Sequence, residues 1–328
     1  MSKVARAVAA DIWANYDTFI FDADGVLWIG NNPIDGSTTL INQLVEKGKS
    51  VIVMSNNATR TPRDYLEKCK KLGFTALKEE NIVSAGLVAA YELKKLQHGE
   101  TLDPKECSGL SRSIPQNLPV YLVGSYALQE TLKEYAGVES FGPGPDPFDN
   151  YTQDTFLSNV DISQKVSAVV GSFDPHISYV KIMKAANYLN DPNVHFIVTN
   201  EDVTYPSDNP NVVVPGTGCI TSVLRFVSGR QPVVTGKPHT AAFNFIRERH
   251  HIEPKRTLMV GDRCDTDMWF GNRHGLDTLL VLSGIHNLDN VAQFENNKQL
   301  ECIPKFYANS TKDLTLECGL NSVHNGNI

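Results

Sequence analysis

Short runs of apolar residues alternate with helical patterns in the first hundred residues. Thr18–Phe21 and Ser50–Met54 are uninterrupted β-rich runs, typical of strands that are buried on both faces. Between them, apolar residues recur at the spacing of an α-helix, at Leu40, Ile41, Leu44 and Val45. This order predicts a strand–helix–strand unit with parallel strands. Further helices are expected downstream, one starting at Thr61-Pro62 and one from Asn81 to Lys95.

The same alternation restarts after a stretch from about His98 to Gln116, which carries proline, glycine, serine and mixed charge without periodicity. Beyond it, strands are predicted at Val120–Val123, Val166–Val170, Val194–Val198 and Val212–Val214, and helices at Ser125–Tyr135, Ser178–Leu189 and Thr221–Val227. These elements predict a second α/β unit.

From Pro232 onward the pattern of the first unit resumes. Strands are expected at Pro232–Thr235, Thr257–Val260 and Thr278–Leu282, with a helix through Ala242, Phe243 and Ile246. We therefore predict an α/β protein with a Rossmann-like, doubly wound parallel sheet as its core and a second, inserted α/β domain. The predicted division is 1–100 for the first part of the core, 101–231 for the insert, and 232–328 for the second part of the core with a loose C-terminal tail.

The composition narrows the compartment and the partners. The length of 328 residues favours two domains over a single core. The formal net charge of −7 argues against nucleic acid or an anionic membrane as partner, because both require a basic face. No apolar run reaches the length of a membrane span or a signal-peptide core. Six cysteines without a C-x-x-C pair indicate a reducing compartment, so we expect a cytoplasmic protein.

Polar residues follow four of the predicted strands. They are Asp22 and Asp24 after the first strand, Ser55 and Asn56 after the second, Lys237 after a third, and Asp262 and Asp267 after a fourth. Each group alone is common in turns. In one doubly wound sheet, however, all four would meet in the crevice at the carboxyl ends of the strands. The sequence therefore predicts one site with acids, neutral donors and a cation.

The acids of this site suit phosphoryl transfer with a metal ion. Asp22 can attack phosphorus, provided that a cation offsets the repulsion between neighbouring carboxylates. Mg²⁺ prefers oxygen ligands, which Asp22, the backbone carbonyl of Asp24 and Asp262 could supply. Asp24 can protonate the leaving oxygen and later activate water. Asp267 is expected to orient the metal site from outside the ligand set.

The remaining members of the site suit the phosphate itself. Ser55 and Asn56 offer neutral hydrogen-bond donors, and Lys237 offers a full positive charge. Together with the acids, they predict a small phosphorylated metabolite as substrate.

The motifs DADGVLW, VIVMSNNATRT, VTGKP and MVGDRCDTD closely resemble the haloacid dehalogenase superfamily of phosphatases and occur in the family's order. The insert is similar to the large cap domain of the branch with phosphoglycolate phosphatase, pyridoxal phosphate phosphatase (chronophin) and the 4-nitrophenylphosphatases. The resemblance implies Mg²⁺, an aspartyl-phosphate intermediate and a homodimer formed through the caps. The cap stretches VVGSFDPHISYVKI and PGTGC look most like the phosphoglycolate phosphatases, which implies 2-phosphoglycolate as substrate and 4-nitrophenyl phosphate as a test substrate.

Four residues of the insert are candidates for substrate specificity: Asp174, His176, Asn200 and Tyr205. The pyridoxal phosphatases carry a histidine where this chain has Tyr205, which lowers the weight of pyridoxal 5′-phosphate as the alternative substrate. A tyrosine can still stack on a ring or donate a hydrogen bond, and it can equally be a half-buried loop aromatic. His176 is expected to pack in its loop rather than to catalyse.

A phospho-accepting signalling module without turnover is the alternative from another class. Such modules also gather acids, a hydroxyl and a lysine at strand ends. They have no leaving group to protonate, however, and so no need for an acid at the position of Asp24. Asp24 and the large insert therefore favour a hydrolase.

Overall fold

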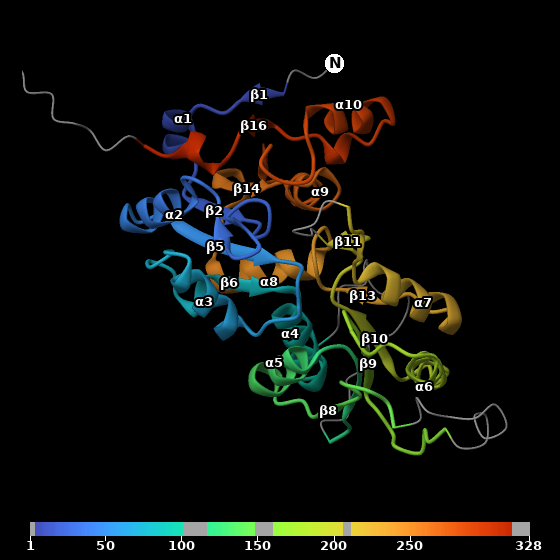
Figure 1. Cartoon of the computed structure of the whole chain (residues 1–328). Helices are drawn as coiled ribbons and strands as arrows, with labels where there is room; N and C mark the ends of the chain where they lie inside the picture. The colour runs from blue at the N-terminus through green and yellow to red at the C-terminus, as the bar shows by residue number, and fades with distance from the viewer. Residues whose placement is uncertain (1–3, 101–116, 148–159, 206–210, 317–328) are drawn as a thin grey trace, which may run out of the picture.

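Two parallel β-sheets, each covered by helices on both faces, make up the architecture of the chain (Figure 1). The computed structural model describes residues 4–100, 117–147, 160–205 and 211–316. The larger sheet carries the first and last strands and lies in the upper part of Figure 1, with the smaller sheet below it. The predicted α/β class, with a doubly wound parallel core and a second α/β unit, is confirmed.

The larger sheet has the strand order β1-β16-β15-β14-β2-β5-β6, with all pairs parallel in the described residues. The bounds of its strands are β1 Ala5–Arg6, β2 Thr18–Phe21, β5 Ser50–Ser55, β6 Ile82–Ser84, β14 Thr257–Gly261, β15 Asp277–Val281 and β16 Phe306–Ala308. From β2 the chain runs outward through β5 and β6, and it later returns on the other side of β2 through β14. The strand order therefore reverses at β2, which is where ligands bind in open α/β sheets.

Alternate side chains of β2 face opposite layers of helices. Phe19 and Phe21 pack in one cluster with residues of α1 (Ala9–Asn15), α2 (Ser37–Glu46) and α3 (Pro62–Lys71). Ile20 lies in the opposite cluster with residues of α4 (Ala85–Gln97), α8 (Thr240–His250) and α9 (Trp269–Arg273). All four residues of β2 are buried, which explains why the strand reads as an uninterrupted apolar run.

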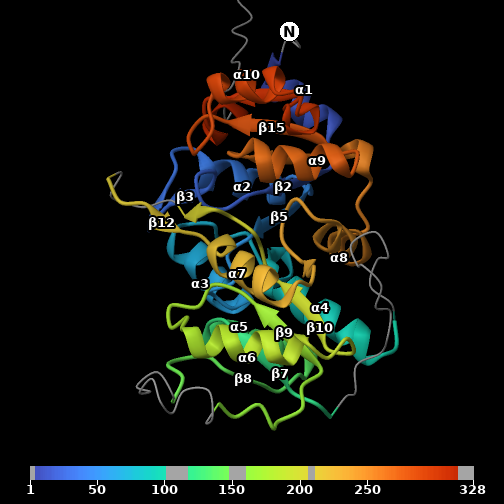
Figure 2. The ribbon, with the colours of Figure 1, turned by 90° about the vertical axis from the view of Figure 1, so that its right-hand side faces the viewer.

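The smaller sheet has the order β13-β10-β9-β7-β8, again parallel throughout the described segments. Its strands are β7 Val120–Val123, β8 Ser140–Phe141, β9 Ala168–Gly171, β10 His195–Val198 and β13 Val233–Val234. Helices α4 and α5 (Tyr126–Ala136) cover one face, and α6 (Tyr179–Leu189) and α7 (Gly218–Ser228) cover the other (Figure 2). We call this unit, which spans the described residues between 117 and 235, the cap.

Smaller elements complete the described chain. Two hairpins are formed by β3 (Trp28–Ile29) with β4 (Asn32–Pro33) and by β11 (Thr204–Tyr205) with β12 (Val214–Pro215). The remaining helical elements are α10 Leu288–Asn296, a π-helical turn Cys264–Met268, and 3₁₀ turns at Glu79–Asn81, Pro254–Arg256, Leu300–Cys302 and Thr311–Leu314. Among all the residues that the structure describes, no helix is both long and apolar enough to cross a membrane.

The strand before Lys237 corrects the sequence prediction. Val233 and Val234 pair with Ile197 and Val198 of β10, so β13 belongs to the cap sheet and not to the core sheet. A short apolar run forms the same hydrogen bonds at the edge of either sheet, and its sequence does not specify which one. The assignment of Pro232–Thr235 to the core was therefore wrong.

The segment after residue 80 also differs from the prediction. Ile82–Ser84 form the edge strand β6, and the helix begins only at Ala85, where the Ser84 hydroxyl caps it by accepting a hydrogen bond from the Leu87 N–H. One part of α4 packs with the core and a later part with the cap. The predicted boundary near residue 100 precedes residues 101–116, which lie outside the described chain, as does the predicted tail from Asn321 onward. Apart from the strand before Lys237, the domain division therefore stays a prediction.

Candidate active site

Three adjacent strands of the core deliver the predicted acids and hydroxyl to one edge. Asp22 directly follows β2, Ser55 is the last residue of β5, and Asp262 directly follows β14. These strands are neighbours and parallel, so their carboxyl ends meet. Their side chains line a cavity of about 60 Å³ together with Lys237, which comes from the loop after β13. The predicted meeting of the four motifs is thus found in the structure, although Lys237 enters from the cap sheet.

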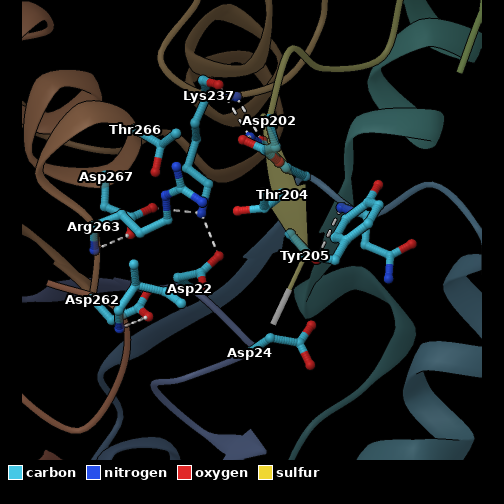
Figure 3. Close-up of a pocket in the computed structure, with 14 residues that line it drawn as sticks. Asp22, Asp24, Asp202, Thr204, Tyr205, Lys237, Asp262, Arg263, Thr266 and Asp267 are labelled. Carbon is cyan, nitrogen blue, oxygen red and sulfur yellow. Dashed lines mark hydrogen bonds and ion pairs between the residues drawn. The ribbon is translucent and has the colours of Figure 1, made fainter. Parts of the chain in front are cut away.

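Asp22, Asp262 and Asp267 form a compact group of carboxylates (Figure 3). One oxygen of each lies within 4.8 Å of the others. Burial raises the pKa of Asp22 well above its ordinary value; the charge of Lys237 opposes this rise, and the charges of Asp267 and Asp262 add to it. Burial and the charge of Asp267 likewise raise the pKa of Asp262 to about 7. A divalent cation would remove this repulsion, and three carboxylates are a suitable oxygen donor set for Mg²⁺.

Lys237 places a positive charge beside the carboxylates of the site. Its Nζ lies 2.5 Å from Asp22 Oδ1 and 2.8 Å from Asp267 Oδ1, and it donates a hydrogen bond to the Met54 carbonyl at 3.2 Å. Burial alone would lower the pKa of Lys237, but the attraction of Asp22 and Asp267 outweighs it and raises the pKa. A charged ammonium group is therefore fixed beside the predicted nucleophile.

Asp267 has a second contact that holds it in place. Its Oδ2 accepts a hydrogen bond from the Arg263 N–H at 3.1 Å. Both oxygens thus have protein partners, which agrees with the predicted orienting role, while its distance to Asp22 and Asp262 would also permit a metal contact. The role of Asp267 outside the metal ligand set therefore stays a prediction.

Asp24 points away from Asp22 (Figure 3), and its carboxylate contacts Trp28. The indole Nε1 of Trp28 donates to Asp24 Oδ1 at 2.8 Å, and the Lys68 Nζ lies 4.0 Å from the same oxygen. Burial raises the pKa of Asp24, and the charge of Lys68 acts against this shift. Asp24 borders both the inner cavity and a wider outer cavity of about 540 Å³. The role of Asp24 as general acid and base stays a prediction.

Two glycines make room for Asp262. A Cβ added to Gly25 or Gly284 would lie only 2.3 Å or 2.0 Å from Asp262 Oδ2. Gly25 also has a φ of +86°, which favours glycine. The same oxygen accepts a hydrogen bond from the Ile285 N–H at 2.8 Å. The close approach of these backbone segments fixes the carboxylate at the floor of the cavity.

Ser55 and Asn56 both lie at the cavity, but their side chains have different partners. The Ser55 Oγ is 3.0 Å from the Tyr65 hydroxyl and accepts a hydrogen bond from the Asn57 N–H at 3.2 Å. The Asn56 side chain instead bonds to the main chain of Lys237 and to Asp202. Phosphate binding by both residues stays a prediction, and for Asn56 the structure shows a different set of contacts.

The four cap candidates divide into two pairs. Tyr205 lines both cavities, and its hydroxyl lies 2.7 Å from Thr217 Oγ1. The Tyr205 and Phe173 rings pack edge to face, with their centroids 5.9 Å apart. Asn200 is buried behind the cavity wall and donates to Asp202 Oδ2 at 2.7 Å. These two residues therefore lie at the cavity or next to a residue that lines it, and their role in specificity stays a prediction.

Asp174 and His176 do not line either cavity in the described structure. Asp174 forms a fully buried ion pair with Lys181 at 2.6 Å and accepts the His176 N–H at 2.8 Å. The ion pair ties the loop before α6 to that helix, and His176 itself is exposed. Sequence proximity to the cap loop suggested a role at the pocket, but the side chain of Asp174 turns inward to neutralise a buried lysine.

Several lining residues were not singled out from the sequence, although two of them, Asp202 and Thr204, lie in the segment Asn200 to Tyr205 that was expected to shape the pocket. Asn57, Asp202, Thr204, Arg263, Thr266 and Ile285 also line the inner cavity. Arg263 pairs with Asp265 through two contacts of 3.1 and 2.9 Å, and burial of the Asp202 carboxyl group raises its pKa. Both lie next to predicted residues, Arg263 after Asp262 and Asp202 two positions after Asn200. That adjacency was the available signal.

Two family models match the chain where these motifs lie. A haloacid dehalogenase-like hydrolase model matches residues 19–138, and a HAD-hydrolase-like model matches residues 234–314. The human protein named glycerol-3-phosphate phosphatase is 35% identical over 317 residues, covering 94% of this chain and 92% of that protein. The chain belongs to the haloacid dehalogenase-like hydrolases. Human chronophin is 32% identical over 95% of this chain and 97% of its own length.

The chain is also similar to a longer protein with a different name and to solved phosphatases. A Caenorhabditis elegans protein named as a putative NipSnap protein is 45% identical over 83% of this chain, which spans about half (49%) of that relative. The solved p-nitrophenyl phosphatase from Archaeoglobus fulgidus is similar with a TM-score of 0.72 and 26% identity, over 92% of this chain and 98% of that one. A Mycobacterium tuberculosis glycerol phosphate phosphatase, solved with magnesium, shares the fold at a TM-score of 0.69 and 23% identity, over 93% of this chain and 78% of that one. The resemblance inferred from the motifs is confirmed, and the chain is a haloacid dehalogenase-family phosphatase.

Proposed function

We propose that this phosphatase hydrolyses small phosphomonoesters with Mg²⁺ through a covalent phosphoryl group on Asp22. The observation that carries the proposal is the position of the Lys237 ammonium, 2.5 Å from Asp22 Oδ1, beside three carboxylates at the switch point of the sheet. Mg²⁺ held by Asp22, Asp262 and the Asp24 carbonyl would neutralise charge on the phosphoryl oxygens.

The residues of the chain account for both halves of the reaction. In the first half, an Asp22 oxygen bonds to phosphorus, the bond to the ester oxygen breaks, and Asp24 gives that oxygen a proton. In the second half, Asp24 takes a proton from water, the water oxygen bonds to phosphorus, and the bond to Asp22 breaks. Lys237 offsets negative charge on the phosphoryl oxygens in both halves.

The rim of the cavity supports a small, polar leaving group. Arg263 could meet the carboxylate of 2-phosphoglycolate, whereas Asp202 and Thr204 could accept or donate hydrogen bonds to the hydroxyls of glycerol 3-phosphate. The relative named glycerol-3-phosphate phosphatase supports the second ester as a candidate beside the first. Pyridoxal 5′-phosphate ranks below both, because the Tyr205 ring already packs against Phe173 and its hydroxyl against Thr217.

Phosphate release tests this proposal directly. We would compare kcat/KM for 2-phosphoglycolate, glycerol 3-phosphate and pyridoxal 5′-phosphate with Mg²⁺, using Asp22→Asn as the inactive control. A preference of about tenfold or more for either small ester, roughly 1.4 kcal/mol of transition-state binding, would support the rim assignment. A preference for pyridoxal 5′-phosphate would reverse it. A phosphorylated protein that releases no phosphate would establish the signalling alternative.

A further inference from the structure

The Asn56 carboxamide pairs with both main-chain groups of Lys237. Asn56 Oδ1 accepts the Lys237 N–H at 2.8 Å, and Asn56 Nδ2 donates to the Lys237 carbonyl at 3.1 Å. All of these atoms are buried. Two hydrogen bonds from one planar group to one residue fix both the position and the tilt of the backbone that carries the lysine side chain.

The preceding glycine shows how closely the two loops approach. A Cβ on Gly236 would lie 2.7 Å from Asn56 Oδ1 and 2.6 Å from the Thr199 carbonyl oxygen. No side chain larger than hydrogen fits there without moving the Asn56 loop or the cap strand. The glycine before the lysine is therefore explained by this pairing.

The cap holds the same carboxamide from the other side. The Nδ2 group of Asn56 also donates to Asp202 Oδ1 at 3.2 Å, and Asp202 Oδ2 accepts a hydrogen bond from Asn200 at 2.7 Å. Both amide hydrogens of Asn56 thus have acceptors, one on Lys237 and one on the cap. A side chain with all its hydrogens used in this way has none left to donate to a phosphate oxygen.

This chain of contacts ends at the reacting atoms. The Lys237 ammonium lies between Asp22 and Asp267, at 2.5 and 2.8 Å. A displacement on the order of 1 Å in such a group can cost about 10²-fold in rate. We propose that Asn56 is a positioning residue for Lys237, and that Asp202 of the cap orients the Asn56 carboxamide. The inference rests on the proposed phosphatase function.

The alternative role of Asn56 is the direct phosphate contact expected from the sequence. That role predicts a weaker apparent affinity for phosphate after truncation of Asn56, independent of Asp202. The positioning role predicts a loss in kcat that truncation of Asp202 reproduces in part. The two roles therefore differ in which kinetic constant changes and in whether the two residues act together.

The experiment uses Asn56→Ala, Asp202→Ala and the double variant, with 4-nitrophenyl phosphate as substrate and inorganic phosphate as inhibitor. We expect Asn56→Ala to lower kcat by about 10- to 100-fold, as for other orienting partners, with KM and phosphate inhibition changed less than about threefold. Asp202→Ala should lower kcat by roughly tenfold, and the double variant should be no slower than Asn56→Ala alone. Asp202→Asn, which keeps an acceptor oxygen, should recover most of kcat.

Glu201→Gln is the matched control, because it changes the neighbouring carboxylate, which pairs with Arg225 and His239 rather than with Asn56. Its kcat should stay within about twofold of the parent value. The inference is overturned if Asp202→Ala keeps parental kcat, if the two losses multiply, or if Asn56→Ala changes only KM and phosphate inhibition.

A second readout separates this inference from the proposed function. If the parent protein releases phosphate from no ester, the proposed function fails. Denaturant unfolding of the parent, Asn56→Ala, Asp202→Ala and the double variant would then still measure the coupling between Asn56 and Asp202. Additive losses of stability would contradict the contact itself, and coupled losses would support it.

Discussion

Replacing Lys237 with methionine removes the ammonium group beside Asp22 while keeping most of the side-chain volume. The Nζ of Lys237 lies 2.5 Å from Asp22 Oδ1, so a phosphoryl group on Asp22 would place its oxygens at roughly 4 Å from that charge. At an effective dielectric constant of about 20, one such charge pair is worth about 4 kcal/mol. Each 1.36 kcal/mol corresponds to a tenfold change in rate, so we expect kcat/KM to fall about 10³-fold.

The assay is hydrolysis of 4-nitrophenyl phosphate at saturating Mg²⁺, with Lys68→Met as the matched control. Lys68 also contacts an acid of the site, but its Nζ lies 4.0 Å from Asp24 Oδ1. That variant should lose about tenfold or less, because a longer contact at a more exposed position is weaker. A Lys237→Met enzyme within tenfold of the parent would refute the assignment of Lys237 as the main counter-charge of the phosphoryl group.

The same substitution should change how the metal-free protein responds to Mg²⁺. Without Lys237, the carboxylates of Asp22, Asp262 and Asp267 lose their buried counter-charge. A ligand that binds only the folded state raises Tm, and here the cation would also relieve the added repulsion. We therefore expect Mg²⁺ to raise the Tm of Lys237→Met by more than it raises that of the parent. An equal or smaller shift would contradict the view that these carboxylates share one cation site.

Three further predictions follow from the same structure. In the metal-free folded protein the pKa of Asp262 is about 7, against an ordinary value of 3.8. At pH values between these two, the folded state binds a proton that the unfolded state does not, so the Tm of the metal-free protein should fall as pH rises from 5 to 7. Asp262→Asn should reduce this dependence of Tm on pH in thermal melts. Asp174→Asn should lower the free energy of unfolding, measured with denaturant, by about 3–5 kcal/mol, because it breaks a buried ion pair. The ratios of kcat/KM among the three esters should stay constant, and a changed ratio would mean that Asp174 contributes to substrate specificity. Phe226 of α7 is 88% exposed, beside exposed Val223 and Val227, so Phe226→Ser should convert the expected cap-mediated dimer to a monomer in light scattering, and a dimer that persists would exclude this helix as the interface.

The core of the site could be predicted because its information is local. Asp22 and Asp262 directly follow buried strands, and such strands are recognisable as apolar runs. In a parallel sheet, the carboxyl ends of neighbouring strands lie at one edge. Two local facts therefore suffice to bring these residues together, even though about 240 positions separate them in the chain.

The cap contributions could not be predicted in the same way, because they depend on how two sheets meet. The strand before Lys237 has the composition of a core strand, and only its pairing with β10 places it in the cap. Asp174 and Asp202 are both acids in cap loops, yet one turns inward to Lys181 and the other turns toward Asn56. Which of these occurs is decided by the nearest buried cation or amide, and that neighbour is remote in sequence.

Lys237 links these two observations. The backbone of Lys237 follows a strand of the cap sheet, and its side chain contacts the core carboxylate of Asp22. The side chain of Asn56 accepts a hydrogen bond from the N–H of the same lysine. In a chain where the cation came from a core strand, the cap could move without moving the charge. Here a shift of the cap that breaks the Asn56–Asp202 contact also removes a support of Lys237. The position of the cap and the position of the Lys237 charge are therefore coupled through the Asn56 carboxamide. Measuring kcat for the Asp202 variants also tests this coupling.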